Sequence, residues 1–168
     1  MTLARSELIE FLKEVEKELS RSITVVAVGG TALTLLRVKS STRDLDFTIP
    51  GQDYREFQRA LKNTPHGFKV DCWPDGMVFS QTLPDDYVKK SSNIRKLKRI
   101  KLKALSPVDI VVTKIGRLDA RDKQDIQACI KRFKLRKDQI AKRAKRVKYV
   151  GRESNYQINL NHVLENFF

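Results

Sequence analysis

The segment VVAVGGTALTLLRVKSSTRDLDFTI, residues 25–49, constrains the fold more than any other part of the chain. A β-branched apolar run ends at Gly29 and Gly30, and a second apolar run begins with Asp44 and Asp46. Side chains alternate across a strand, so the two aspartates share one face of the second strand. Two carboxylates this close repel each other, and the pattern therefore predicts a cation between them.

The two halves of this segment supply complementary chemistry. Mg²⁺, or Mn²⁺ in its place, takes oxygen ligands, usually one or two carboxylates together with phosphate oxygens and water. A helix that begins at the glycine pair presents free backbone amides, and glycine lets a phosphate approach them closely. A glycine pair alone is commonly a tight turn, and two aspartates alone can lie on a solvated edge. In this order and at this spacing they predict phosphoryl or nucleotidyl transfer.

The pattern resembles the minimal nucleotidyltransferases of the DNA polymerase β-like superfamily. Their signature is an apolar residue, two small residues, a short spacer and an Asp-x-Asp or Asp-x-Glu flanked by apolar residues. It stands here as Val28-Gly29-Gly30 and Asp44-Leu45-Asp46-Phe47. The resemblance implies an α+β protein with a mixed β-sheet, helices packed on that sheet, and an active site along one sheet edge.

The resemblance also implies roles for individual residues. Asp44 and Asp46 would bind Mg²⁺ or Mn²⁺. A third carboxylate often lies on a later strand of these proteins, and FKVDCW places Asp71 in that position. It would either complete the metal site or help deprotonate the acceptor hydroxyl. The backbone amides of the glycine pair, with the Thr31 hydroxyl, would bind the phosphates of a nucleoside triphosphate.

The downstream segment SPVDIVVTKIGRLDARDKQDI resembles the abortive-infection type toxins of the same superfamily, which carry a helical lysine followed by an arginine–aspartate cluster. The matching residues are Lys114, Arg121, Asp122 and Asp125. Lys114 would neutralise charge on the triphosphate. Arg117 and Arg121 could contact phosphate, or they could pair with Asp119 and Asp122 on the surface. Either Asp122 or Asp125 could be the functional one, or both could only complement the helix dipole.

The charge of the chain predicts a polyanionic partner. There are 34 Lys and Arg against 20 Asp and Glu, a net charge of +14. Residues 89–103 contain no acid, and residues 131–148 contain one. We expect both blocks to form one continuous positive face that binds RNA, with Arg143, Lys145 and Arg146 among the contacts. The alternative is a solvated, lysine-rich surface.

Two classes of function follow. The first is a magnesium-dependent enzyme that transfers a nucleotide from a nucleoside triphosphate to an acceptor, with RNA as the expected acceptor. The alternative is a non-catalytic nucleic-acid-binding protein, or a toxin–antitoxin component with an antitoxin protein as its partner, built on the same fold. The paired aspartates favour the enzyme, because a protein that only binds phosphate gains nothing from carboxylates that repel it.

The organisation of the chain predicts a nucleotidyltransferase-like domain at residues 1–130 and a basic helical extension at 131–168 packed on it. No apolar run approaches the roughly 20 residues of a membrane span, so we expect no membrane association. Cys72 and Cys129 lack metal-ligand spacing, and reduced thiols of a cytoplasmic protein are expected rather than a disulfide. Helices are expected over 5–20, 31–36, 53–63, 107–118, 122–133, 137–148 and 162–168, and strands over 23–28, 44–49, 68–73 and 100–104.

Overall fold

A mixed five-stranded sheet forms the centre of the computed structural model, which describes all residues from Met1 to Phe168. The strand order is β5-β4-β2-β9-β8, where β2 is antiparallel to β4 and parallel to β9, β4 is parallel to β5, and β8 is antiparallel to β9. The strand bounds are β2 (Ile23–Ala27), β4 (Leu45–Ile49), β5 (Val70–Pro74), β8 (Ser92–Lys96) and β9 (Ile100–Ala104). The predicted α+β class is confirmed.

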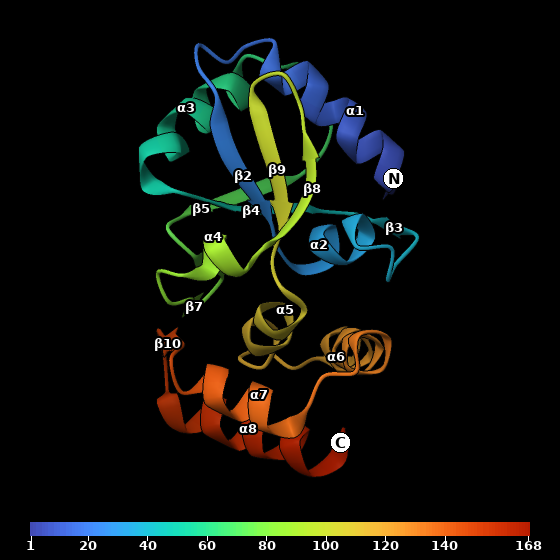
Figure 1. The fold of residues 1–168 in the computed structure, drawn as a ribbon, viewed down its shortest axis with the longest axis vertical. Coiled ribbons are helices and arrows are strands. Elements are labelled where there is room, and N and C mark those ends of the chain that lie inside the picture. The colour runs from blue at the N-terminus through green and yellow to red at the C-terminus, as the bar shows by residue number, and fades with distance from the viewer.

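Helices surround this sheet and form a layer beyond it. Figure 1 shows α1 and α3 beside the upper part of the sheet, α2 below it, and α5 to α8 grouped at the lower end. Two small sheets join β1 (Leu3–Ala4) to β3 (Ser41–Thr42), and β7 (Gln81–Thr82) to both β6 (Met77–Val78) and β10 (Lys148–Tyr149). The helix bounds are α1 (Arg5–Glu16), α2 (Gly29–Leu35), α3 (Gly51–Lys62), α4 (Tyr87–Lys90), α5 (Pro107–Lys114), α6 (Ala120–Phe133), α7 (Lys137–Ala144) and α8 (Glu153–Asn166).

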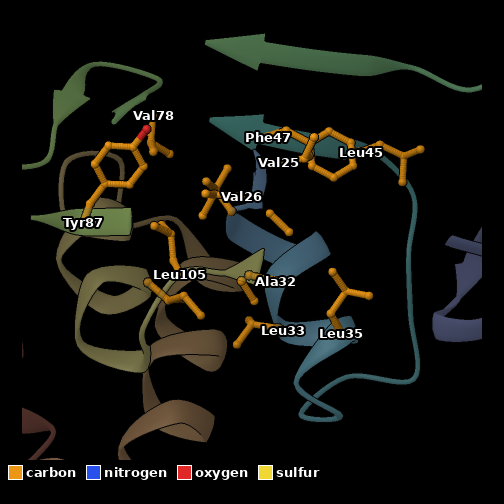
Figure 2. Close-up of a cluster of buried hydrophobic side chains, with 14 of the residues drawn as sticks. Val25, Val26, Ala32, Leu33, Leu35, Leu45, Phe47, Val78, Tyr87 and Leu105 are labelled. Atoms are coloured by element: carbon orange, nitrogen blue, oxygen red, sulfur yellow. The ribbon is translucent and has the colours of Figure 1, made fainter. Parts of the chain in front are cut away.

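The core fixes α2 against the strands that carry the two sequence motifs. Figure 2 shows Ala32, Leu33 and Leu35 of α2 near Val26 of β2 and Leu45 of β4. All five of these side chains are at most 2% exposed. Burial of a large aliphatic side chain contributes roughly 1.5–3 kcal/mol. The start of α2 and the start of β4 are therefore held in a fixed relative position.

The C-terminal part of the chain differs from the sequence prediction. The basic helix α7 ends at Ala144, because Lys148 and Tyr149 pair with β7 as a short strand. α8 begins at Glu153, nine residues before the helix expected over 162–168, and continues to Asn166. Tyr156, Leu160 and Val163 form its buried stripe at helical spacing. The polar residues between these three positions hide the stripe in the sequence. The boundary proposed at residue 130 stays a prediction.

The expected continuous basic face does not form. The turn between β8 and β9, in the middle of the 89–103 block, lies at the opposite end of the molecule from α7 in Figure 1. Lys90, near one end of the first block, shares a pocket with Lys142 and Arg146 of the second. The reason is topological: β8 and β9 carry the first block along one edge of the sheet to its far end, whereas the second block stays in the helical layer.

Two further findings concern the sequence expectations on location. None of the helices combines the length and apolarity that a membrane crossing requires. Both cysteines are free thiols, Cys72 half-buried and Cys129 buried.

Candidate active site

The hydroxyl of Thr31 joins the glycine-led helix to the aspartate strand. It donates to the carbonyl of Asp44 at 3.1 Å and accepts from the backbone N–H of Asp46 at 2.9 Å. The Thr31 side chain is fully buried, and its only proton is already used. The sequence prediction that this hydroxyl binds phosphate is therefore wrong. Thr31 instead sets the position of the two aspartates relative to α2.

The glycine pair lies directly against the aspartates. Gly29 has φ +53°, a left-handed conformation that suits glycine, and a Cβ built there would lie 3.6 Å from Oδ2 of Asp46. A Cβ at Gly30 would lie 3.1 Å from the Thr42 hydroxyl. The close approach of backbone and carboxylate leaves room for small groups only. The backbone at the start of α2 and the Asp46 carboxylate thus share one confined space, as the sequence pattern predicts.

Three carboxylates gather at this edge of the sheet. Asp46 lies opposite Asp71 in the parallel register of β4 and β5, and Asp44 immediately precedes β4. The Asp46 side chain is buried, and its Oδ1 has no hydrogen-bond partner. Burial, followed by the charges of Asp71 and Asp44, raises the pKa of Asp46 to about 6. The ionised form of Asp46 is therefore destabilised, and a nearby cation would stabilise it.

The donor set fits a magnesium ion that shares its ligands with a substrate. No group of three or more His, Cys, Asp or Glu side chains in the chain has the spacing of a preformed metal site. Mg²⁺ commonly takes one or two carboxylates and completes its shell with phosphate oxygens and water, so Asp44 and Asp46 suffice. The unpartnered Oδ1 of Asp46 is the structural feature that fits such an ion.

A network of charges surrounds Lys114 at the end of α5. Its Nζ lies 3.0 Å from Asp125 and 3.3 Å from Asp122, so both candidate aspartates contact it. Arg117 makes two bonds to Asp122, at 2.8 and 2.9 Å, and Lys39 lies 3.4 Å from Asp125. Lys114 is 9% exposed and Asp122 only 1%. The capping box that Asp119 and Asp122 form fixes the start of α6 and keeps this network in place.

Arg117 lies beside the site, in the place that the sequence assigned to Arg121. A pocket of about 260 Å³ is lined by Gly29, Lys114 and Arg117, whereas Arg121 is exposed and does not line it. The two hydrogen bonds to Asp122 raise the pKa of Arg117, with a smaller contribution from Asp46. The Arg117 guanidinium also lies 5.4 Å from the centre of the Phe79 ring. α5 ends at Lys114, and the turn that follows it places Arg117 within hydrogen-bonding distance of Asp122, which also contacts Lys114.

The three basic residues expected to bind RNA separate into two kinds. Arg143 is 7% exposed and bonds Asp109 at 2.6 and 3.0 Å and Asp86 at 2.9 Å. Its guanidinium is used inside the protein, so the expectation of a surface contact is wrong for this residue. Lys145 and Arg146 are exposed. They remain candidates for contact with a polyanion.

The pKa of Asp46 leads to a prediction about stability and pH. Asp46→Asn should stabilise the protein at pH 8 by up to about 3 kcal/mol, the free energy of roughly two pKa units. The folded pKa of about 6 exceeds the ordinary 3.8, so folding is penalised progressively as the pH rises between these values and fully above pH 6. The gain should vanish near pH 4, where Asp46 is protonated in the folded protein.

Urea unfolding at both pH values, without metal and with chelator present, measures this difference. Asp85→Asn is a matched control, because Asp85 is exposed and its replacement removes the same charge. Equal stability of wild type and Asp46→Asn at pH 8 would show that Asp46 carries no burial penalty.

The fold and this site define the class of protein. The structure is similar to the crystal structure of ANT(2″)-Ia in complex with adenylyl-2″-tobramycin, with a TM-score of 0.56 and 12% sequence identity over 84% of this chain and 94% of that chain. The fold is therefore of the nucleotidyltransferase type. A family model described as nucleotidyltransferase of unknown function (DUF6036) matches residues 5–166, and the chain belongs to this family. A search of curated protein sequences finds no significant match.

Proposed function

We propose that the protein transfers a nucleotide from a nucleoside triphosphate to a hydroxyl of an acceptor, with Mg²⁺ or Mn²⁺ as cofactor. One observation carries this proposal: the buried, unpartnered carboxylate of Asp46 lies against the glycine pair that opens α2, and Thr31 holds the two together. In a protein that merely bound phosphate, this carboxylate would repel the ligand and weaken its binding. The membership of a nucleotidyltransferase family supports the same conclusion.

Each residue of the site has a place in the proposed reaction. Asp44 and Asp46 would hold the metal, which when bound supplies neutralisation of phosphate charge. The backbone amides at Gly29 and Gly30 would bind the terminal phosphates. The acceptor oxygen attacks the α-phosphorus, the bond from that phosphorus to the bridging oxygen breaks, and pyrophosphate leaves with the bonding electrons. Asp71, whose side chain is 38% exposed, would accept the proton of the acceptor hydroxyl.

Lys114 and Arg117 would neutralise charge on the triphosphate. Both line the pocket next to Gly29, and Arg117 has a side chain that is 58% exposed. Asp122 and Asp125 hold Lys114 in place beside the pocket. This arrangement gives the two aspartates a positioning role, and it supports the proposed likeness to the abortive-infection type toxins. An antitoxin protein would then be a partner, and the free cysteines are consistent with the cytoplasm as the location.

RNA is the acceptor that we propose, because the net charge of +14 attracts a polyanion. The experiment combines the purified protein, Mg²⁺ or Mn²⁺ and total RNA with each of the four α-labelled ribonucleoside triphosphates. We expect label in RNA with at least one of them. If no triphosphate leaves label in RNA, protein or small molecules, the proposal of nucleotidyl transfer is overturned. If label is found outside RNA only, the transfer stands and only the proposal of RNA as acceptor is overturned.

The exposed cations after α7 give a separate prediction about RNA binding. Each phosphate contact on a single strand adds about 0.7 to the slope of log affinity against log salt concentration. Replacing Lys145 and Arg146 with glutamine removes two such contacts, so it should lower this slope by about 1.4 and leave triphosphate binding intact. Arg143 is excluded because it is buried. A control with the same loss of charge replaces Arg55 and Lys62, which are exposed on α3. An unchanged slope in the first variant would contradict the proposed RNA surface.

A further inference from the structure

Three arginines from distant parts of the sequence line one pocket on the side of α1, α2 and β8. Arg5 begins α1, Arg37 follows α2 and Arg95 lies on β8. The pocket has a volume of about 590 Å³ and includes Lys39. Figure 1 shows the start of α1, α2 and the β3 turn on the same side of the molecule. The remaining lining residues are Ala4, Ser6, Ile9, Glu10, Thr34, Val38 and Ser40, so only one acid is present.

The three arginines differ in their ion pairing from the arginines that line the pocket beside α7; Arg5 is half-buried, and Arg37 and Arg95 are exposed. None of the three forms an ion pair in the structure, whereas Arg143 and Arg146 in the pocket beside α7 pair with Asp109 and Asp86. The one carboxylate in the arginine pocket, that of Glu10, pairs with Lys13 instead. Three like charges that converge without a counter-charge repel one another, and a bound anion would relieve that repulsion.

Arg37 lies at the end of α2 in a backbone conformation that residues other than glycine seldom adopt. α2 ends in a Schellman motif, in which Arg37 N–H donates to the Thr34 carbonyl and Val38 N–H donates to the Leu33 carbonyl. Arg37 occupies the left-handed position of this motif, with φ +63°. Glycine is the residue that favours this position, because a Cβ is unfavourable there. Four other non-glycine residues, Asp75, Phe79, Leu118 and Lys134, adopt a positive φ as well, so replacing Arg37 with glycine should relieve backbone strain without altering the fold.

Arg5 is already oriented for a ligand. Its Nε donates to the carbonyl of Leu35 at 3.1 Å, which fixes the plane of its guanidinium at the end of α2. Burial, and then the charges of Arg37 and Arg95, lower the pKa of Arg5. A planar guanidinium with free N–H groups matches the oxygens of a phosphate, and several around one pocket form a clamp for it. Lys39 connects this pocket to the glycine pair, since its Nζ lies 3.9 Å from where a Cβ of Gly30 would be.

We propose that Arg5, Arg37 and Arg95 form a binding pocket for a phosphate group, and that this pocket is separate from the glycine pair. The phosphate could belong to the backbone of a nucleic acid or to a free phosphorylated molecule. Binding requires no nucleotide transfer and no metal, so it does not rest on the proposed function.

The probes are inorganic pyrophosphate and a dephosphorylated 12-mer of oligouridylate, each titrated in chelator by calorimetry or fluorescence anisotropy. Wild type should bind at least one of them, and the Arg37→Gly, Arg95→Gln double variant should bind it at least tenfold more weakly. Arg55→Gln with Arg132→Gln removes the same charge from exposed positions outside the pocket and should change affinity less than twofold. Binding of the 12-mer identifies a nucleic-acid backbone as the source, and binding of pyrophosphate alone identifies a free phosphorylated molecule.

Arg37→Gly alone separates function from folding. It should raise the melting temperature by about 2–4 °C by removing the left-handed Cβ, while weakening the binding of the probe. The variant Asp44→Asn, Asp46→Asn keeps all three arginines and should bind the probes like wild type, even where transfer is lost. The proposal fails if wild type binds neither probe. It also fails if the arginine variants bind no more weakly than the charge-matched control.

Discussion

Replacing Asp44 and Asp46 together with asparagine should lower the rate of nucleotide transfer at least about 10³-fold, or about 4 kcal/mol in activation free energy. Asparagine keeps the size of both side chains but removes the charges that would bind the metal. The hydrogen bonds of Thr31 run to the backbone of the two residues, so the link between β4 and α2 should survive. The effect is measured by comparing the single-turnover rates of wild type and variant. Both are supplied with labelled triphosphate and with the acceptor that has been identified for the wild type.

The control for this variant must remove two exposed carboxylates elsewhere. Asp85→Asn with Glu165→Gln does so, and it should retain the wild-type rate. Calorimetry with Mn²⁺ and a non-hydrolysable triphosphate provides a second measurement that needs no acceptor. We expect wild type to bind Mn²⁺ better with the nucleotide than without it, and the paired variant to show little binding in either case. Unchanged turnover or unchanged Mn²⁺ binding in the variant would remove Asp44 and Asp46 from the site.

The part of the site that was predictable from the sequence is the part encoded by local patterns. The β-branched run, the glycine pair and the alternation around Asp46 are each contained within a few residues, and their periodicity determines which side chains share a face. Asp71 was expected only from the family resemblance, and the structure places it opposite Asp46 in the parallel register of β4 and β5. The expected helices α1 to α3 and α5 to α7 and the strands β2, β4, β5 and β9 followed from the same patterns, within about four residues at their ends, whereas the start of α8 and the two- to five-residue segments between the main elements did not.

The remainder depends on contacts between residues far apart in the chain. The hydroxyl of Thr31 could bind phosphate or backbone, and only the packing of α2 on β4 decides between them. The choice of Arg117 over Arg121 depends on where α5 ends and how α6 begins. The arginine pocket joins residues that lie from 32 to 90 positions apart. No local periodicity encodes such proximity. The composition therefore predicted a continuous basic face, whereas the fold brings three arginines from distant parts of the chain into one pocket.

Arg143 shows this limit of the sequence most clearly, and its removal should have the largest effect on stability. Within an acid-poor segment it looks like a surface cation, yet its partner Asp109 is 34 positions away and fully buried. Burial raises the pKa of Asp109, and the two bonds from Arg143 oppose that rise. Arg143→Ala should therefore lower the free energy of unfolding by about 3–5 kcal/mol at pH 7, because it leaves an uncompensated buried carboxylate.

Urea unfolding of three variants separates the effect of losing the Arg143–Asp109 ion pair from the effect of losing one positive charge. Arg146→Ala is the matched control, since Arg146 is 57% exposed and lies 3.4 Å from Asp86, and its loss should cost less than about 1 kcal/mol. Replacing both partners, as Arg143→Met with Asp109→Leu, removes the buried charge as well and should recover most of the stability that Arg143→Ala loses. A loss below 1 kcal/mol in Arg143→Ala would place its guanidinium in solvent and restore it as a candidate contact for RNA.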